Sequence, residues 1–155
     1  MKTIYKAFWL VSMLAFAAVA SAGNPAVGTW SLNVAKSKFS PGPAPKSDTR
    51  TYTESADGIT MTWKSTGASG KEMTVVSTFK TDGKDYPVTG TPNFDTLTLK
   101  QVDSHTVQSV QKKGGKVIGE STRSVSKDGK VLTLSSKGTG ADGVAYDNVM
   151  VYDKQ

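Results

Sequence analysis

Apolar and polar residues alternate with a period of two over most of the chain that follows residue 22. Apolar side chains take nearly every second position, with threonine, serine or lysine between them, in residues 30–34, 59–63, 73–79, 97–99 and 132–134. Successive side chains of a β-strand point to opposite faces of the sheet, so this period predicts strands with one buried face. No stretch has the i, i+3, i+4, i+7 spacing of an amphipathic helix. The pattern therefore predicts an all-β chain.

Short turn signals separate these runs. They are the dipeptides Asp57-Gly58, Asp82-Gly83, Gly114-Gly115, Asp128-Gly129 and Asp142-Gly143. Glycine adopts positive φ without a steric penalty and aspartate tolerates it, so these dipeptides predict tight hairpin turns. Each strand would then pair mostly with its neighbour in sequence. We expect a meander of eight to ten strands.

Prolines limit what the connections can be. Pro41, Pro43 and Pro45 exclude a helix from segment 40–45, which we expect to be an extended crossover after the first strand. Pro87 places the short strand 86–88 at an edge or a bulge. A meander exposes its edges unless it closes, and a closed barrel of this strand number holds packed side chains or one small ligand. We predict a single up-and-down antiparallel β-barrel without a helical lid.

The first 22 residues have the pattern of a signal peptide. Lys2 and Lys6 precede an apolar run over residues 7–20, and Ala20-Ser21-Ala22 supplies small residues for cleavage. The alternative is a membrane anchor, but the run is shorter than the roughly 20 residues that cross a bilayer. We predict cleavage after Ala22, a barrel domain over residues 23–155, and a location in the periplasm or the extracellular medium.

Composition excludes several classes of site. The chain has no cysteine and one histidine, which removes disulfides, cysteine zinc sites and histidine metal clusters. The net charge of +6 is dispersed, and the basic hairpin tip 112–116 is expected to be solvated. No basic and aromatic face predicts nucleic-acid binding, and no glycine-rich loop predicts a nucleotide site. We expect a monomer with no metal and no cofactor.

Both ends of the mature chain carry motifs of known barrels. Gly28-Thr29-Trp30 is similar to the G-x-W motif that begins the first strand in the calycin group, the lipocalins and fatty-acid-binding proteins. Arg123 and the segments 128–134 and 151–154 resemble the last two strands of a fatty-acid-binding protein, and the chain is also similar to small exported bacterial proteins described as lipocalin-like. The resemblance implies a ligand-binding barrel, with Gly28 and Trp30 as structural residues at its closed end.

The chain also departs from these families. The proline-rich segment stands where fatty-acid-binding proteins have a helical lid, and the disulfide and terminal helix of lipocalins are missing. Tyr152 matches the tyrosine that grips a ligand carboxylate in fatty-acid-binding proteins, but Met150 stands at the position of its partner arginine. The resemblance therefore implies the fold more than it implies a fatty-acid ligand.

A ligand in such a barrel would contact the inward residues of several strands. The apolar candidates for the interior are Ile59, Met61, Trp63, Met73, Val75, Phe79, Leu97 and Leu99. Trp63 fits either the core or the cavity mouth. The polar candidates are Arg123 and Tyr152, and Arg123 is expected to share a face with Val117, Ser121 and Val125, with a bend at Gly119. The ligand-binding candidates are Trp63, Phe79, Arg123, Tyr152, Met61 and Met73.

Arg123 carries the most information about function. A buried arginine needs an anion or hydrogen-bonding partners. Two roles stay open: an anchor for a ligand carboxylate, and a structural brace stacked on Trp30, which the resemblance supports.

Three classes of function can be compared. The leading hypothesis is an exported, non-enzymatic lipocalin-like barrel that binds a small apolar or amphipathic ligand. The alternative is a protein-interaction or inhibitor module that uses loops at one barrel end, in segment 41–45 or 86–94. Asp103, Ser104 and His105 are adjacent, point in different directions and predict a turn rather than a catalytic triad. We therefore expect no enzyme and assign no catalytic residue.

Overall fold

The computed structural model describes residues 23–155, so the predicted signal peptide over residues 1–22 lies outside the described residues. Ten strands form one antiparallel sheet in the order β4-β3-β2-β1-β10-β9-β8-β7-β6-β5. The strands are β1 (Gly28–Leu32), β2 (Ser47–Ser55), β3 (Gly58–Thr66), β4 (Glu72–Phe79), β5 (Asp82–Pro87), β6 (Thr96–Gln101), β7 (Thr106–Lys113), β8 (Lys116–Val125), β9 (Val131–Thr139) and β10 (Ala145–Lys154). Within residues 23–155 the one helical element is a single 3-10 turn, η1 (Val34–Lys36).

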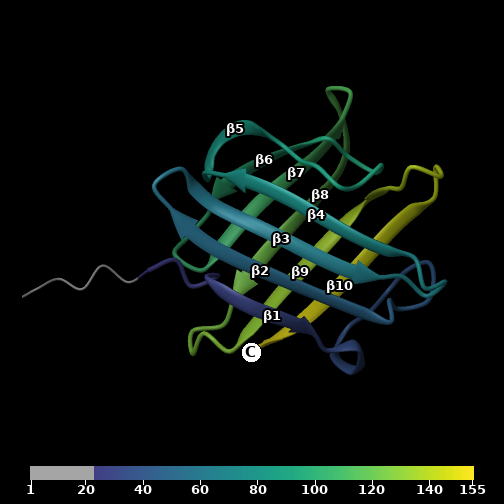
Figure 1. Ribbon diagram of the computed structural model, residues 1–155, viewed down its shortest axis with the longest axis horizontal. Coiled ribbons are helices and arrows are strands. Elements are labelled where there is room, and N and C mark those ends of the chain that lie inside the picture. The colour runs from purple at the N-terminus through teal and green to yellow at the C-terminus, as the bar shows by residue number, and fades with distance from the viewer. Residues whose placement is uncertain (1–22) are drawn as a thin grey trace, which may run out of the picture.

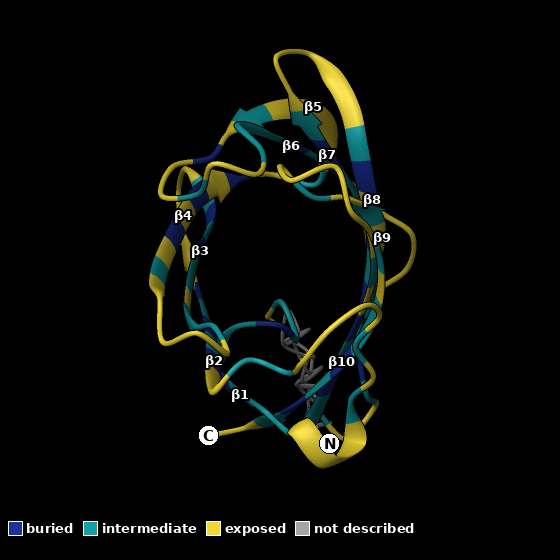
Figure 2. Ribbon diagram, turned by 90° about the vertical axis from the view of Figure 1, so that its right-hand side faces the viewer, coloured by how far each residue is buried: buried dark blue, intermediate teal, exposed yellow. Residues whose placement is uncertain are grey.

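The sheet curls into a nearly closed barrel. Strands β1 to β4 cross in front of β7 to β10 in Figure 1, and the end-on view of Figure 2 shows the strands as a ring. The two ends of the strand order meet where Val76 and Thr89 exchange backbone hydrogen bonds of 3.1 and 3.0 Å. The prediction of an up-and-down antiparallel barrel of eight to ten strands is confirmed, and no helical lid covers it within the described residues.

The barrel has a packed end, where β1 begins and β10 ends. Trp30 is fully buried there, and its indole N–H donates to the carbonyl of Ala26 at 2.7 Å. The ammonium of Lys154 lies 5.1 Å from the centre of the Trp30 ring. Gly28 has a φ of +128°, and a Cβ there would lie 2.9 Å from the Lys154 side chain. Glycine at position 28 therefore suits both the backbone conformation and the close approach of Lys154.

Predicted alternation matches the observed core in most strands. The buried apolar residues form one cluster: Ala26, Trp30, Tyr52, Ile59, Met61, Val75, Phe79, Val88, Leu97, Leu99, Val107, Val125, Leu132, Leu134, Met150 and Tyr152. Threonine, serine and lysine at the intervening positions of these strands are half-buried or exposed for the most part. Burial of this face drives the closure of the sheet.

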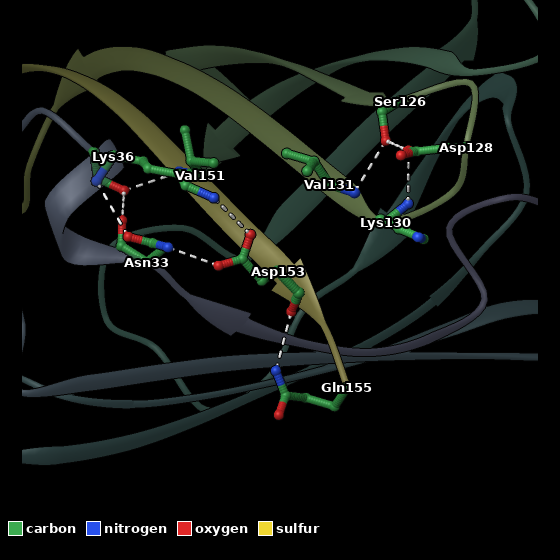
Figure 3. Close-up of polar contacts among 10 residues, drawn as sticks. Asn33, Lys36, Ser126, Asp128, Lys130, Val131, Val151, Asp153 and Gln155 are labelled. Atoms are coloured by element: carbon green, nitrogen blue, oxygen red, sulfur yellow. Dashed lines mark hydrogen bonds and ion pairs between the residues drawn. The ribbon is translucent and has the colours of Figure 1, made fainter.

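Polar contacts hold the outer face of β10 and the β8–β9 turn (Figure 3). The carboxylate of Asp153 accepts hydrogen bonds from Asn33 at 2.6 Å and from Lys36 at 3.2 Å. These two contacts tie the segment after β1 to β10. In the turn, the hydroxyl of Ser126 donates to Asp128 at 2.5 Å, and the same carboxylate oxygen accepts from the Lys130 backbone N–H at 3.1 Å.

Three local predictions need correction. Strand β1 ends at Leu32, so Val34 is exposed in η1 and does not share the buried face of Trp30. A bulge in β8 opposite Gln111 lets Ile118 line the interior, which leaves Val117 exposed rather than beside Arg123. The predicted bend at Gly119 adjoins this bulge.

The third correction concerns a turn. Asp82 and Gly83 lie inside β5 at a register shift rather than between two strands. The other four dipeptides lie at hairpin turns, with Gly58 as the first residue of β3. Segment 37–46 links η1 to β2 without a strand or helix. It runs beside β10, where the Asp147 N–H donates to the Ser40 carbonyl at 2.7 Å.

Candidate ligand-binding cavity

The barrel encloses a cavity of about 330 Å³. Its lining comes from strands on every side of the barrel and from the connections at the end opposite Trp30, which we call the open end. Phe39, Pro45 and Phe94 line it from these connections. Asn93 and Thr139 belong to the lining and are exposed, so the cavity reaches the surface at the open end. The volume is at the lower limit of the range for small-molecule sites.

A buried ion pair on β2 is tied to β3 and β10. Asp48 and Arg50 are both less than a tenth exposed, and their charged groups lie 3.9 Å apart. The phenol of Tyr152 donates to Asp48 at 3.0 Å and accepts from Arg50 at 2.9 Å. The indole N–H of Trp63 donates to the other Asp48 oxygen at 2.6 Å, and the Arg50 guanidinium lies 4.4 Å from the Trp63 ring centre. Arg50 is thus neutralised within the protein.

The protonation of this cluster follows from its burial and charges. Burial is the largest influence on Tyr152 and raises the pKa of its phenol, against the opposing effect of the Arg50 charge. Burial lowers the pKa of Arg50, but Tyr152, Tyr52 and Asp48 together raise it above its ordinary value. The cluster therefore holds a protonated phenol that bridges a guanidinium and the Asp48 carboxylate.

Arg123 is the second buried guanidinium, and it differs from Arg50 in having no acid beside it. It reaches from β8 across the barrel and lies 4.7 Å from the ring centre of Tyr52 on β2. In the part of the chain that the structure describes, no carboxylate lies within ion-pair distance of it. Burial raises the pKa of the Tyr52 phenol, but Arg123 and Arg50 together bring it below its ordinary value. With Asp48 paired to Arg50, the buried residues among 23–155 carry one positive charge without an acidic partner, that of Arg123.

One side of the cavity is apolar. Met61 and Trp63 from β3, Phe79 from β4, and Leu97 and Leu99 from β6 line it. These residues were predicted to face the interior, and that orientation is confirmed. Their contact with a ligand stays a prediction.

Strands β7 and β8 add a group of polar side chains to the lining, beside the apolar Val107 and Ile118. These are Ser109 and Gln111 of β7 and Ser121 of β8, and Ser121 is paired with Ser109 across the ladder. The Ser109 and Ser121 hydroxyls lie 2.7 Å apart, and the Gln111 amide N–H donates to Ser121 at 3.3 Å. The Gln111 Oε1 is buried and has no hydrogen-bond partner among residues 23–155.

The predicted site residues occupy different positions relative to this cavity. Trp63, Phe79, Arg123 and Met61 line it. Tyr152 is fully buried in the Asp48 cluster and is not part of the lining. Met73 packs against the core but is not part of the lining either. The ring covered by Arg123 is Tyr52 and the cation over Trp30 is Lys154, so a brace of Arg123 on Trp30 is not what the structure contains.

Sequence reasoning missed the charged face of β2. Asp48, Arg50 and Tyr52 alternate with Thr49 and Thr51, which is the same period of two that identified the other strands. Alternation of apolar residues does not identify a strand whose inward residues are charged. Arg50 donates to the Tyr152 phenol from this strand.

The turn that contains the single histidine lies outside the cavity. Asp103, Ser104 and His105 connect β6 to β7, as predicted. The Ser104 hydroxyl lies 2.8 Å from the His105 Nδ1, and the Asp103 carboxylate accepts from the His105 backbone N–H rather than from its ring.

Fold and cavity together define a class: a nearly closed antiparallel up-and-down barrel around a small cavity, compatible with a calycin-like fold. No protein-family model matches the chain, and no curated protein matches its sequence. Within residues 23–155, no helix has the length and apolar character needed to cross a membrane.

Proposed function

We propose that this protein is an exported, non-enzymatic barrel of the lipocalin and fatty-acid-binding-protein group that binds one small amphipathic acid. The observation that carries the proposal is Arg123, a buried guanidinium that lines the cavity and has no carboxylate partner among the described residues. A charge buried in this way is costly unless an anion pairs with it. A ligand carboxylate would supply that anion and accept two parallel hydrogen bonds from the guanidinium.

The two buried arginines would have different roles. Arg50 already faces Asp48 and Tyr152, so its charge and its Nε–H are used within the protein. Arg123 contacts Tyr52 and has no carboxylate within ion-pair distance among the described residues. We therefore assign the ligand carboxylate to Arg123 and a structural role to Arg50.

The rest of the ligand would lie against the apolar side of the cavity. Met61, Phe79 and Leu97 offer it an aliphatic and aromatic surface. The cavity of about 330 Å³ is at the small end of ligand sites, and we propose a single acid with a chain of about ten carbons as its occupant. Export is proposed from the leader over residues 1–22, which would place the barrel in the periplasm or the medium.

Binding can be tested with decanoate and decan-1-ol, which share a chain length and differ in charge. The protein is purified after expression of the full chain, and each compound is titrated while native mass spectrometry and calorimetry follow binding. We expect one decanoate per barrel and at least tenfold weaker binding of the alcohol. Equal binding of the two compounds, or no decanoate adduct, would contradict the proposal.

A further inference from the structure

The polar part of the cavity lining has an order that the carboxylate site does not explain. Along the inner face of β8, Arg123 is followed by Ser121 and then Gly119 toward the open end. Their partners on β7 are Val107, Ser109 and Gln111. Along β7 and β8 the inward side chains therefore change from the cation of Arg123 to hydroxyls and then to an amide toward the open end.

Gln111 ends this series with an unused hydrogen-bonding atom. Its side chain is 8% exposed and lines the cavity, and its one hydrogen bond runs from Nε2 to Ser121. The Oε1 has no partner in the described part of the chain. A buried amide oxygen without a partner costs free energy, so an occupant that donates a hydrogen bond to it is favoured.

Two glycines leave room beside this amide. Gly119 faces Gln111 across one ladder and Gly138 across the other. A Cβ at Gly119 would lie 2.6 Å from the Tyr146 hydroxyl and 2.7 Å from Gln111 Oε1. The Tyr146 hydroxyl and the Gln111 amide can therefore lie this close to the β8 backbone only because position 119 is a glycine.

We infer that Gln111, with Ser109 and Ser121, forms a second polar subsite that recognises a hydroxyl group on the ligand. The inference rests on the proposed function, and it narrows the ligand class to hydroxylated acids. A hydroxyl satisfies Gln111 in either orientation of its amide because an alcohol both donates and accepts. The hydroxyl of the ligand then faces Ser109, Gln111 and Ser121, and its chain lies against the apolar residues of β3, β4 and β6.

The spacing of the two subsites sets the position of the hydroxyl. Arg123 is level with Val107, and Gln111 lies four residues further along β7. At about 3.3 Å per residue, the backbone positions of these two residues are ~13 Å apart along the strand. An extended chain of about ten carbons covers that distance, so the hydroxyl belongs near the end of the chain that is far from the carboxylate.

The test compares 10-hydroxydecanoate with decanoate by calorimetry. A cavity without a polar subsite would bind the hydroxy acid more weakly, because its hydroxyl loses water without compensation. We expect the hydroxy acid to bind about tenfold more tightly to the wild-type protein. In Gln111→Met this advantage is expected to disappear, with decanoate binding preserved.

Gln108→Met is the matched control, since Gln108 is an exposed glutamine on the outer face of the same strand. It is expected to keep the preference for the hydroxy acid. Denaturant unfolding of both variants establishes that they are folded. Decanoate binding without a hydroxyl preference, or a preference that survives Gln111→Met, would overturn the second subsite alone. Failure of both acids to bind would instead reject the proposed function.

Discussion

Replacement of Arg123 by methionine separates an anchor from a brace. In the ligand-free protein, Arg123 has no counter-ion among the described residues, and its guanidinium contacts the face of Tyr52. A desolvated cation–π contact stabilises the fold by about 2 kcal/mol. Burial of an unpaired charge costs several kcal/mol even after relaxation. The net effect of Arg123→Met on the free energy of unfolding is therefore between no change and a gain of about 3 kcal/mol.

Arg50→Met is the contrasting variant. It removes the partner of Asp48 and leaves a buried carboxylate with only the hydrogen bonds from Tyr152 and Trp63. Removal of one member of a buried pair costs about 3–5 kcal/mol. The two arginine-to-methionine variants should therefore differ in stability by at least about 3 kcal/mol, although both delete a buried guanidinium.

Urea unfolding of the delipidated proteins at neutral pH measures this difference, with decanoate binding determined in parallel. Arg123→Met should keep its stability and lose decanoate binding by about 30-fold or more, because a buried charge pair is lost on binding. A loss of 2 kcal/mol or more in ligand-free Arg123→Met would show that Arg123 is a brace. That result would refute the assignment of Arg123 as the ligand anchor.

Three further predictions concern ionisation and packing. Arg123 and Arg50 lower the pKa of Tyr52, so absorbance at 295 nm should show one tyrosine ionising below about pH 10, a step missing in Tyr52→Phe. Because the folded pKa is below the unfolded one, Tyr52 should add stability as pH rises toward 10. Asn33 and Lys36 lower the pKa of Asp153, so the ionised carboxylate stabilises the fold at neutral pH and this stabilisation is lost in acid. In urea unfolding, Asp153→Asn should therefore lose less stability than the wild-type protein between pH 7 and pH 3. A Cβ at Gly138 would lie 2.6 Å from Gly119 Cα, so Gly138→Ala should cost about 1–3 kcal/mol in thermal unfolding, and an unchanged melting temperature would contradict that packing.

Most of the barrel could be predicted because its strands bury apolar residues at every second position. The β3 residues Ile59 and Met61 show this, as do Leu132 and Leu134 on β9. Local changes of the backbone could not be predicted because the alternation of apolar and polar residues does not determine where a strand ends or bulges. Val117 illustrates the effect of a bulge. One extra residue in β8 turns the side chains that precede it to the opposite face of the sheet.

The candidate site was only partly predictable for a different reason. Arg123 could be recognised because it shares the inner face of β8 with Ser121 and Val125. Asp48 and Arg50 lie on a strand whose inward face is charged, and their pairing depends on Tyr152, about a hundred residues away. The unused oxygen of Gln111 depends on the packing of three side chains, which a period of two does not contain.

The central claim is that a carboxylate binds to Arg123 inside the barrel. Carbon-13 NMR of decanoate labelled at its carboxyl carbon tests this directly, since a bound carboxylate beside a buried guanidinium should have a depressed pKa. We predict one bound signal per protein that does not shift as pH falls through the titration of free decanoate. The signal should be missing in Arg123→Met. A bound carboxyl that titrates like the free acid, or the same signal in the variant, would contradict the account.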